Sequence, residues 1–244
     1  MPKSLKPIFN VQAHTYTDPK DKFQYISVTQ WVNKFKKKFD EQYWATKIAN
    51  RECVPVEVIL EEWERIRENS KVFGTNVHKQ LEVYYTTKKI YNKELLPILE
   101  NFKELNISFN KETFFEKLVY NRKLGIAGTS DIIMHNRDKK TFDVYDFKTN
   151  KKFRYTCEFN EELLPPLKYP AVEYFTYALQ LSMYAYLYKI MSGLEPKRLK
   201  VFWYDRVDKV GYSNLKGQWK IIDLPYLEED INNCLAYEQK KNMA

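Results

Sequence analysis

The residues of this sequence best suited to chemistry are two aspartates and a lysine in two neighbouring apolar segments. Asp131 ends a Gly-Thr-Ser-Asp motif, and Asp146 and Lys148 belong to an Asp-Phe-Lys-Thr motif in the next segment. Two converging carboxylates are ligands that a hard divalent cation prefers. A lysine beside them can hold a water molecule or a phosphate oxygen. The combination indicates metal-assisted cleavage of a phosphodiester.

The acidic and basic residues of the second motif extend an apolar strand face. Residues two apart in a strand point to the same side, so Phe142 and Val144 share a face with Asp146 and Lys148. An acid-x-lysine pair is more often part of a solvated face. Charge beside apolar side chains is costly, however, unless it is paired or binds a metal.

One histidine and one glutamate are further candidate ligands. His78 is one of three histidines and lies in a predicted helix, with Glu82 four residues later on the same side. A neutral imidazole can complete the coordination of a metal held by aspartates, although a lone helical histidine is more often a surface or core residue. Glu116, at the start of the first predicted strand, either points toward the metal or faces water.

Gln180 and Tyr184 are four residues apart on one face of a predicted helix. Simple packing explains the tyrosine equally well. A buried glutamine amide needs hydrogen-bond partners, which favours a role near the site.

A basic and aromatic segment follows the lysine of the second motif. Lys151, Lys152 and Arg154 are candidates for holding a nucleic-acid strand by its phosphates, and Tyr155 is a candidate for stacking on unpaired bases. Solvent exposure of the charges and loop anchoring by the ring are the alternatives.

The elements that must position these residues follow from apolar periodicity and turn residues. We expect an antiparallel meander of three strands, followed by a helix, two strands and a closing helix, over residues 113–121, 126–135, 141–149, 172–191, 197–204, 218–224 and 226–240. Residues 1–24 are expected to form an irregular arm. Four helices should follow, opened by a capping box at Ser27, over residues 27–39, 55–68, 74–89 and 94–105. This order indicates an α/β (α+β) fold with an N-terminal arm and helical lobe (1–106) and a core (107–244) in one compact unit.

The composition restricts the functional classes. The 244 residues include 40 basic and 32 acidic ones, and the net charge of +8 fits a polyanionic partner, although many basic proteins bind none. The three cysteines form no Cys-x-x-Cys motif, so a zinc ribbon is not expected and a reducing compartment fits best. We expect a cytoplasmic protein without a signal peptide, a membrane span or a membrane partner.

The motifs together resemble the RecB-like branch of the PD-(D/E)XK nuclease superfamily over about residues 70–205. The resemblance rests on a series of motifs in the same order, namely His78, Gly-Thr-Ser-Asp131, Asp146-Phe-Lys148-Thr and Gln180-x-x-x-Tyr184. The segment Ser27-Val-Thr29 is also similar to one in mitochondrial genome maintenance exonucleases and related phage exonucleases.

The resemblance implies a restriction-endonuclease-like core, with a mixed central sheet flanked by helices, and an Mg²⁺ or Mn²⁺ site. In this family pattern His78, the two aspartates and the Phe147 backbone carbonyl are metal ligands. Lys148 positions the attacking water, and Gln180 and Tyr184 orient the lysine or the phosphate. The four cysteines that hold an iron–sulfur cluster in some relatives are missing, so no such cluster is expected.

The resulting hypothesis is a metal-dependent deoxyribonuclease, with an exonuclease on single-stranded or end-frayed DNA as the favoured form. An endonuclease of the same superfamily, selective for structure or sequence, is one alternative. A non-catalytic DNA-binding module and a structural partner in a larger complex are two others. The chain has no Walker A motif, so a helicase or recombination partner would be a separate protein. The expected setting is the cytoplasm of a bacterium or of a phage-infected host cell.

Overall fold

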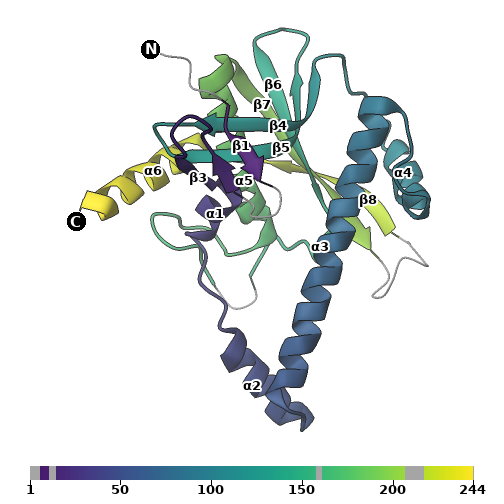
Figure 1. Ribbon diagram of the computed structural model, residues 1–244, viewed down its shortest axis with the longest axis vertical. Coiled ribbons are helices and arrows are strands. Elements are labelled where there is room, and N and C mark those ends of the chain that lie inside the picture. Colours follow the sequence, from purple (N-terminus) through teal and green to yellow (C-terminus); the bar gives the residue numbers. More distant parts are fainter. Residues whose placement is uncertain (1–5, 11–14, 158–160, 207–216, 244) are drawn as a thin grey trace.

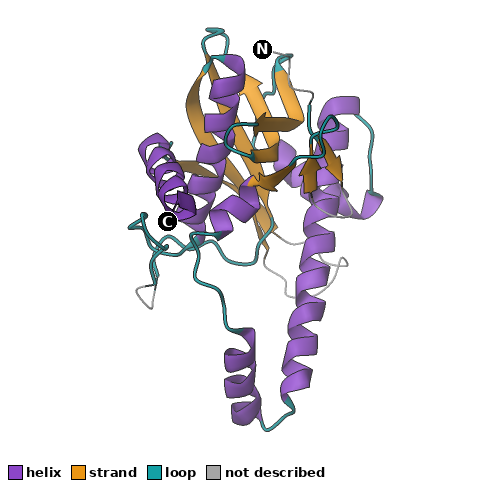
Figure 2. Cartoon of the chain, turned by 60° about the vertical axis from the view of Figure 1, so that its left-hand side comes forward, coloured by secondary structure: helices purple, strands orange, loops and turns teal. Residues whose placement is uncertain are grey.

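A twisted β-sheet forms the centre of the molecule, with helices on both faces (Figures 1 and 2). The computed structural model describes residues 6–10, 15–157, 161–206 and 217–243. The strands are β1 (Ile8–Asn10), β2 (Thr15–Thr17), β3 (Gln24–Ser27), β4 (Thr113–Asn121), β5 (Ile126–His135), β6 (Thr141–Lys148), β7 (Glu195–Arg206) and β8 (Gly217–Leu224). The helices are α1 (Val28–Asn33), α2 (Glu41–Glu52), α3 (Val56–Thr87), the 3₁₀ helix η1 (Lys93–Leu95), α4 (Leu96–Lys103), α5 (Glu173–Ser192) and α6 (Glu228–Met243).

The sheet contains both parallel and antiparallel pairs. Its main order is β1-β2-β3-β5-β6-β7-β8, and β4 pairs with β5 outside this path. The pairs β3–β5 and β6–β7 are parallel, and the other pairs are antiparallel. The predicted α/β (α+β) class with a mixed central sheet flanked by helices is therefore confirmed.

Each face of the sheet has its own apolar core. Phe142 and Val144 of β6 pack with α1, α5 and α6 on one face. Tyr145 and Phe147 of the same strand pack with α3 and α4 on the other. This alternation is the period of two that the sequence predicts, and it places Asp146 and Lys148 on the side of α5.

Strand β5 has an interrupted edge at its Gly-Thr-Ser-Asp motif. On one side it pairs with β4 along most of its length. On the other side β3 pairs with Ile126 and Ala127, and β6 pairs from Ile132 onward. Between these pairings, residues 128–131 have no strand partner on that edge among the described residues. The motif therefore lies in a gap between two strands, where its side chains and backbone are accessible to other elements.

Several predicted elements are confirmed with close boundaries. The strands at 113–121 and 126–135 match β4 and β5, and the helix at 172–191 differs from α5 by one residue at each end. The capping box is also present: Ser27 Oγ accepts from the Gln30 N–H at 3.1 Å, and Gln30 Oε1 accepts from the Ser27 N–H at 3.0 Å.

Two predictions about the helical lobe were wrong. The helices expected at 55–68 and 74–89 are one continuous helix, α3. Gly74 was taken as the start of a helix but lies inside it, because a residue without a side chain allows close contact with the loop after β6. A Cβ atom at Gly74 would lie only 3.1 Å from Thr149 Oγ1.

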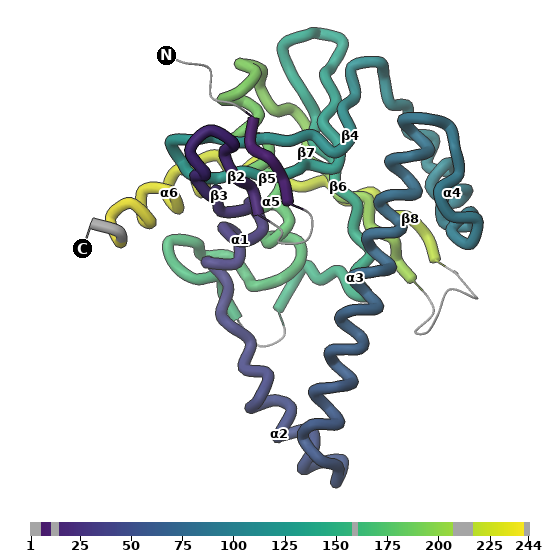
Figure 3. Tube along the Cα trace, viewed as in Figure 1, coloured from purple at the N-terminus to yellow at the C-terminus, as the bar shows by residue number. Residues whose placement is uncertain are grey.

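The N-terminal segment is more regular than predicted. The short strands β1 and β2 and the first residue of β3 lie in described parts of the expected arm, and all three strands join the sheet. The first helix ends at Asn33 instead of residue 39, and α2 was not predicted at all. Helix α2 buries little besides Ala45 and Ala49, so it has only a weak apolar face. It packs against the first half of α3, and the two helices extend away from the sheet (Figures 2 and 3).

None of the helices in the described part of the chain combines the length and apolar character that crossing a membrane requires.

Candidate metal centre

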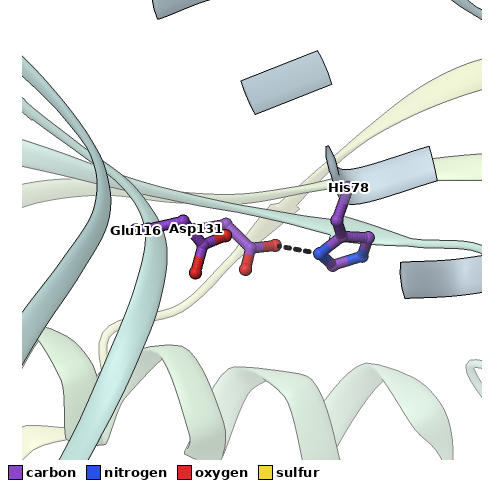
Figure 4. Close-up of side chains that lie close together, drawn as sticks. All are labelled: His78, Glu116 and Asp131. Carbon is purple, nitrogen blue, oxygen red and sulfur yellow. Dashed lines mark ion pairs between the residues drawn. The ribbon is translucent and has the colours of Figure 1, made fainter. Parts of the chain in front are cut away.

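Three potential ligands from three elements meet beside the interrupted edge of β5. His78 of α3, Glu116 of β4 and Asp131 of β5 each offer one ligand atom, and these atoms lie within 4.8 Å of one another. Figure 4 shows the two carboxylates side by side, with the imidazole facing them. The Nδ1 atom of His78 is 3.3 Å from Asp131 Oδ2. One nitrogen and two oxygens at this spacing form a donor set suited to a divalent cation.

The position of His78 depends on the close approach of α3 to the end of β6. Gly74 lies one helical turn before the histidine and contacts Thr149, the threonine of the Asp-Phe-Lys-Thr motif. The imidazole then packs edge-on against the Phe147 ring, with 5.7 Å between ring centroids. The sequence prediction that His78 joins Asp131 is consistent with this geometry.

Glu116 lies opposite Asp131 and has a left-handed backbone. The neighbouring pairs Phe115–Ile132 and Lys117–Ser130 define this register, but no pairing occurs at Glu116 itself. Its φ angle is 49°, a conformation that costs a non-glycine residue about 1–2 kcal/mol. Such strain is characteristic of functional sites. The local kink also explains why Phe115 and Val119 contact opposite cores.

Buried Asp146 and partly buried Lys148 form an ion pair next to this cluster. The Lys148 ammonium contacts Asp146 Oδ2 and lies 4.8 Å from the centroid of the Tyr177 ring. Asp146 follows the last β5–β6 pair, Ile132–Tyr145, and is near enough to Asp131 for their charges to interact. Three carboxylates therefore lie on the neighbouring strands β4, β5 and β6. The structure groups Glu116 with His78 and Asp131, while Asp146 is paired with the lysine.

The contact between His78 and Asp131 determines the charge of both groups. Burial disfavours the imidazolium, but Asp131 outweighs this effect and raises the pKa of His78. Burial likewise disfavours the Asp131 carboxylate, yet His78, Lys148 and the Phe147 N–H together lower its pKa. Binding a cation here would require the imidazole to release its proton.

The other two carboxyl groups bind protons more tightly than usual. Burial, together with the charge of Asp131 and despite Lys148, raises the pKa of Asp146 to about 6. Desolvation and the charge of Asp131 raise the pKa of Glu116 to about 7, although its side chain retains solvent exposure that screens part of this effect. The site thus has more negative charge than its own cations offset. A divalent cation would relieve this repulsion, so the donor set fits Mg²⁺ or Mn²⁺.

The backbone of Phe147 faces the gap in the sheet. Its N–H donates to Asp131 Oδ2 at 2.8 Å. The N–H and C=O groups of one strand residue point to the same edge, so the carbonyl is directed toward the same side. This direction is compatible with the predicted carbonyl ligand.

Gln180 and Tyr184 lie together on α5, beside the Gly-Thr-Ser-Asp motif. The Gln180 amide donates to Thr29 Oγ1 at 3.3 Å and to the Tyr184 hydroxyl at 3.5 Å. Tyr184 is buried, and burial with the charges of the two aspartates raises its pKa well above the ordinary value. The ring packs where a side chain at Gly128 would lie, since a Cβ there would be 2.7 Å from Tyr184 Cε1.

A cavity of about 310 Å³ opens beside the histidine and the lysine. Its lining includes Ser70 and Lys71 of α3, His78, Lys148, the start of the following loop, and Tyr177 of α5. This opening gives a solvent route to the Lys148 ammonium.

The predicted DNA-binding residues occupy the loop after β6. Lys151 and Lys152 are exposed. Arg154 is engaged by Glu173, with its Nε 2.8 Å from Oε2 and a second nitrogen 2.9 Å from Oε1. Tyr155 is exposed and lies near the Tyr174 ring, with 5.4 Å between centroids.

Tyr177 was missed by the sequence interpretation, which named Thr29 in the Ser27-Val-Thr29 segment but gave it no role. Tyr177 lies three residues before Gln180 and seven before Tyr184, so helical spacing places all three near one face. Extending that pattern by one turn would have identified it. Thr29 follows the capping residue of α1 and gave no chemical signal of its own.

Comparison with known proteins identified distantly similar solved structures, among them the following two. The crystal structure of SSO0001 shares 17% identity over 66% of this chain and 68% of that chain, with a TM-score of 0.28. A protein from Eubacterium rectale, whose name describes it as a candidate exonuclease, shares 9% identity over 88% of this chain and 79% of that chain, with a TM-score of 0.40. No family model and no curated protein matches the sequence.

Proposed function

We propose that this protein is a metal-dependent deoxyribonuclease of the PD-(D/E)XK type, similar to the RecB-like branch. The observation that carries the proposal is the set of Glu116, Asp131 and Asp146 on three neighbouring strands, with His78 in contact with Asp131 and Lys148 in contact with Asp146. A binding module would not need three crowded carboxylates next to a buried lysine. Phosphodiester hydrolysis needs such a set, because a cation and an amine can offset charge in the transition state.

The ligands would be His78, Glu116, Asp131 and Asp146, with the Phe147 carbonyl. A bound Mg²⁺ or Mn²⁺ would polarise the phosphate and lower the pKa of a coordinated water. Lys148 retains its proton, because Asp146, Tyr177 and Asp131 together outweigh the effect of burial and raise the lysine pKa. Lys148 therefore serves as a cationic donor to the water or phosphate and not as a general base.

Tyr177 and the pair Gln180–Tyr184 position the reacting groups. Burial raises the pKa of Tyr177 to about 12, so its neutral ring presents a π face to the Lys148 ammonium. Gln180 and Tyr184 hold their polar atoms beside the Gly-Thr-Ser-Asp motif. The substrate we favour is single-stranded or end-frayed DNA, acted on from an end.

A panel of DNA substrates tests this proposal. Single strands labelled at the 5′ or 3′ end, duplexes and closed single-stranded circles are incubated with Mn²⁺, Mg²⁺ or EDTA. We expect metal-dependent digestion of linear strands, whereas the circles should stay intact. The Asp131→Asn variant should be inactive and serves as the control for contaminating nucleases. Cleavage of circles would support an endonuclease instead. If the protein binds DNA but cleaves none of the substrates, a non-catalytic module would be supported instead.

A further inference from the structure

A second groove adjoins the metal centre on the far side of Tyr177. It has a volume of about 280 Å³ and is lined by Lys36, Lys37 and Arg154, by residues 161–163, and by the beginning of α5. Tyr177 lines this groove and also the cavity that contains His78 and Lys148. The two spaces therefore share Tyr177 as part of their walls, and a strand that passes this side chain leads from the cavity into the groove.

Backbone hydrogen bonds at Lys36 and at the preceding residue fix the position of Lys36 at the groove. Its N–H donates to the Asn33 carbonyl at 3.2 Å, just after α1. The preceding residue, Phe35, is buried, and its carbonyl accepts from the Leu164 N–H at 2.8 Å. The end of α1 and the loop before α5 are thus hydrogen-bonded to each other at this point, so the groove has a defined shape.

The Lys36 ammonium has no ion-pair partner among the described residues, although its side chain is partly buried. Burial lowers its pKa, as does the nearby Lys148 charge, while Glu173 acts in the opposite sense. Glu173 is already engaged by Arg154. Glu161 and Glu162 are exposed, so solvent screens their charges. A partly buried amine without an ion-pair partner favours an anion in the groove that it lines.

We propose that Lys36 binds a backbone phosphate of the DNA strand next to the phosphate held at the metal centre. This inference rests on the proposed function and identifies the path of the strand past Tyr177. Lys36 is a positioning residue, since it contacts the substrate away from the reacting atoms.

Binding without cleavage tests the proposal. Fluorescence anisotropy of a labelled (dT)₂₀ strand in EDTA is measured from 50 to 300 mM NaCl for wild type, Lys36→Gln, Lys36→Arg and Lys38→Gln. Lys38 lies two residues after Lys36, in the basic segment Lys34-Phe-Lys-Lys-Lys38. It is exposed and does not line the groove, so it controls for the loss of one charge. Thermal unfolding of each variant verifies that it is folded.

The loss of one phosphate contact to a single strand reduces the salt slope by about 0.7, which is about fivefold in affinity at 0.1 M salt. We expect this change for Lys36→Gln, little change for Lys38→Gln, and recovery with Lys36→Arg. In Mn²⁺ assays Lys36→Gln should raise KM and leave kcat within about twofold. If wild type binds and digests DNA but Lys36→Gln and Lys38→Gln change the affinity and the salt slope equally, this inference alone is overturned. Wild type that neither binds nor digests DNA would overturn the proposed function as well.

Discussion

The contact between Gly128 and Tyr184 leads to a test of how the site is held in place. A Cβ atom at Gly128 would lie 2.7 Å from Tyr184 Cε1 and 2.9 Å from Val28 Cγ2. Relaxed carbon–carbon contacts are about 3.5–4.0 Å. The two neighbours belong to α5 and α1, and both are buried, so neither can move without disturbing the core.

The expected cost of Gly128→Ala follows from these overlaps. Overpacking of a buried site costs about 1–3 kcal/mol, and the upper half of that range applies because two side chains obstruct the methyl group. The smaller unfolded-state entropy of alanine offsets about 0.4–1 kcal/mol. The net loss is then about 2 kcal/mol, or about 4–8 °C in Tm for a protein of this size.

Activity should fall by more than stability explains. Displacement of the Tyr184 ring moves its hydroxyl away from Gln180, and misplacement of a positioning group can lower activity about 100-fold. The control is Gly193→Ala at the end of the same helix. Gly193 has φ of 73° and open space around its Cβ position, so alanine there costs about 1–2 kcal/mol through backbone strain alone.

Thermal unfolding and DNA digestion, measured well below both Tm values, separate the two effects. We expect both variants to be less stable and only Gly128→Ala to lose activity. An active Gly128→Ala protein with wild-type Tm would refute the packing argument. Equal activity losses in the two variants would show that the Tyr184 position does not matter to catalysis.

Three further results are expected. Apparent Mn²⁺ affinity, measured by calorimetry, should fall at least about tenfold from pH 7.5 to 5.5. The reason is that protons held with pKa values of about 7 on Glu116 and about 6 on Asp146, and the proton on His78, whose pKa is raised, must be displaced and are more fully bound as the pH falls; a flat profile would contradict the assignment. Glu116→Gln should weaken Mn²⁺ binding and remove the part of this profile near pH 7, whereas an unaltered profile would exclude Glu116 as a ligand. Lys148→Met should reduce digestion at least about 100-fold and retain Mn²⁺ binding, since the amine stabilises charge and is not a ligand; near-normal digestion would refute its role.

The sequence predicted strands close to β4 to β8 but missed β1 to β3, and it predicted that His78 and Asp131 lie together. The alternation of apolar residues predicts β4 to β6 because each strand buries a face, and the four-residue spacing of Gln180 and Tyr184 correctly predicts that they meet. His78 approaches Asp131, as the helix and motif pattern implied.

Other features depend on contacts between distant segments. The left-handed backbone of Glu116 leaves no mark in a sequence, because glycine would be the usual residue there. The continuity of α3 through Gly74 depends on contact with Thr149, and the gap in β5 depends on the separate pairing of β3 and β6. Local propensity contains no information about such contacts.

Direct titration of Mn²⁺ into metal-free protein tests the central claim, that His78 and the strand carboxylates form a single cation site. Wild type, Asp131→Asn and Asp223→Asn are compared, the last being an exposed aspartate on β8 that pairs with Lys200. We predict saturable binding by wild type and Asp223→Asn, and a loss of at least about tenfold in affinity for Asp131→Asn. Undiminished binding by Asp131→Asn, or no saturable binding by wild type, would contradict the account.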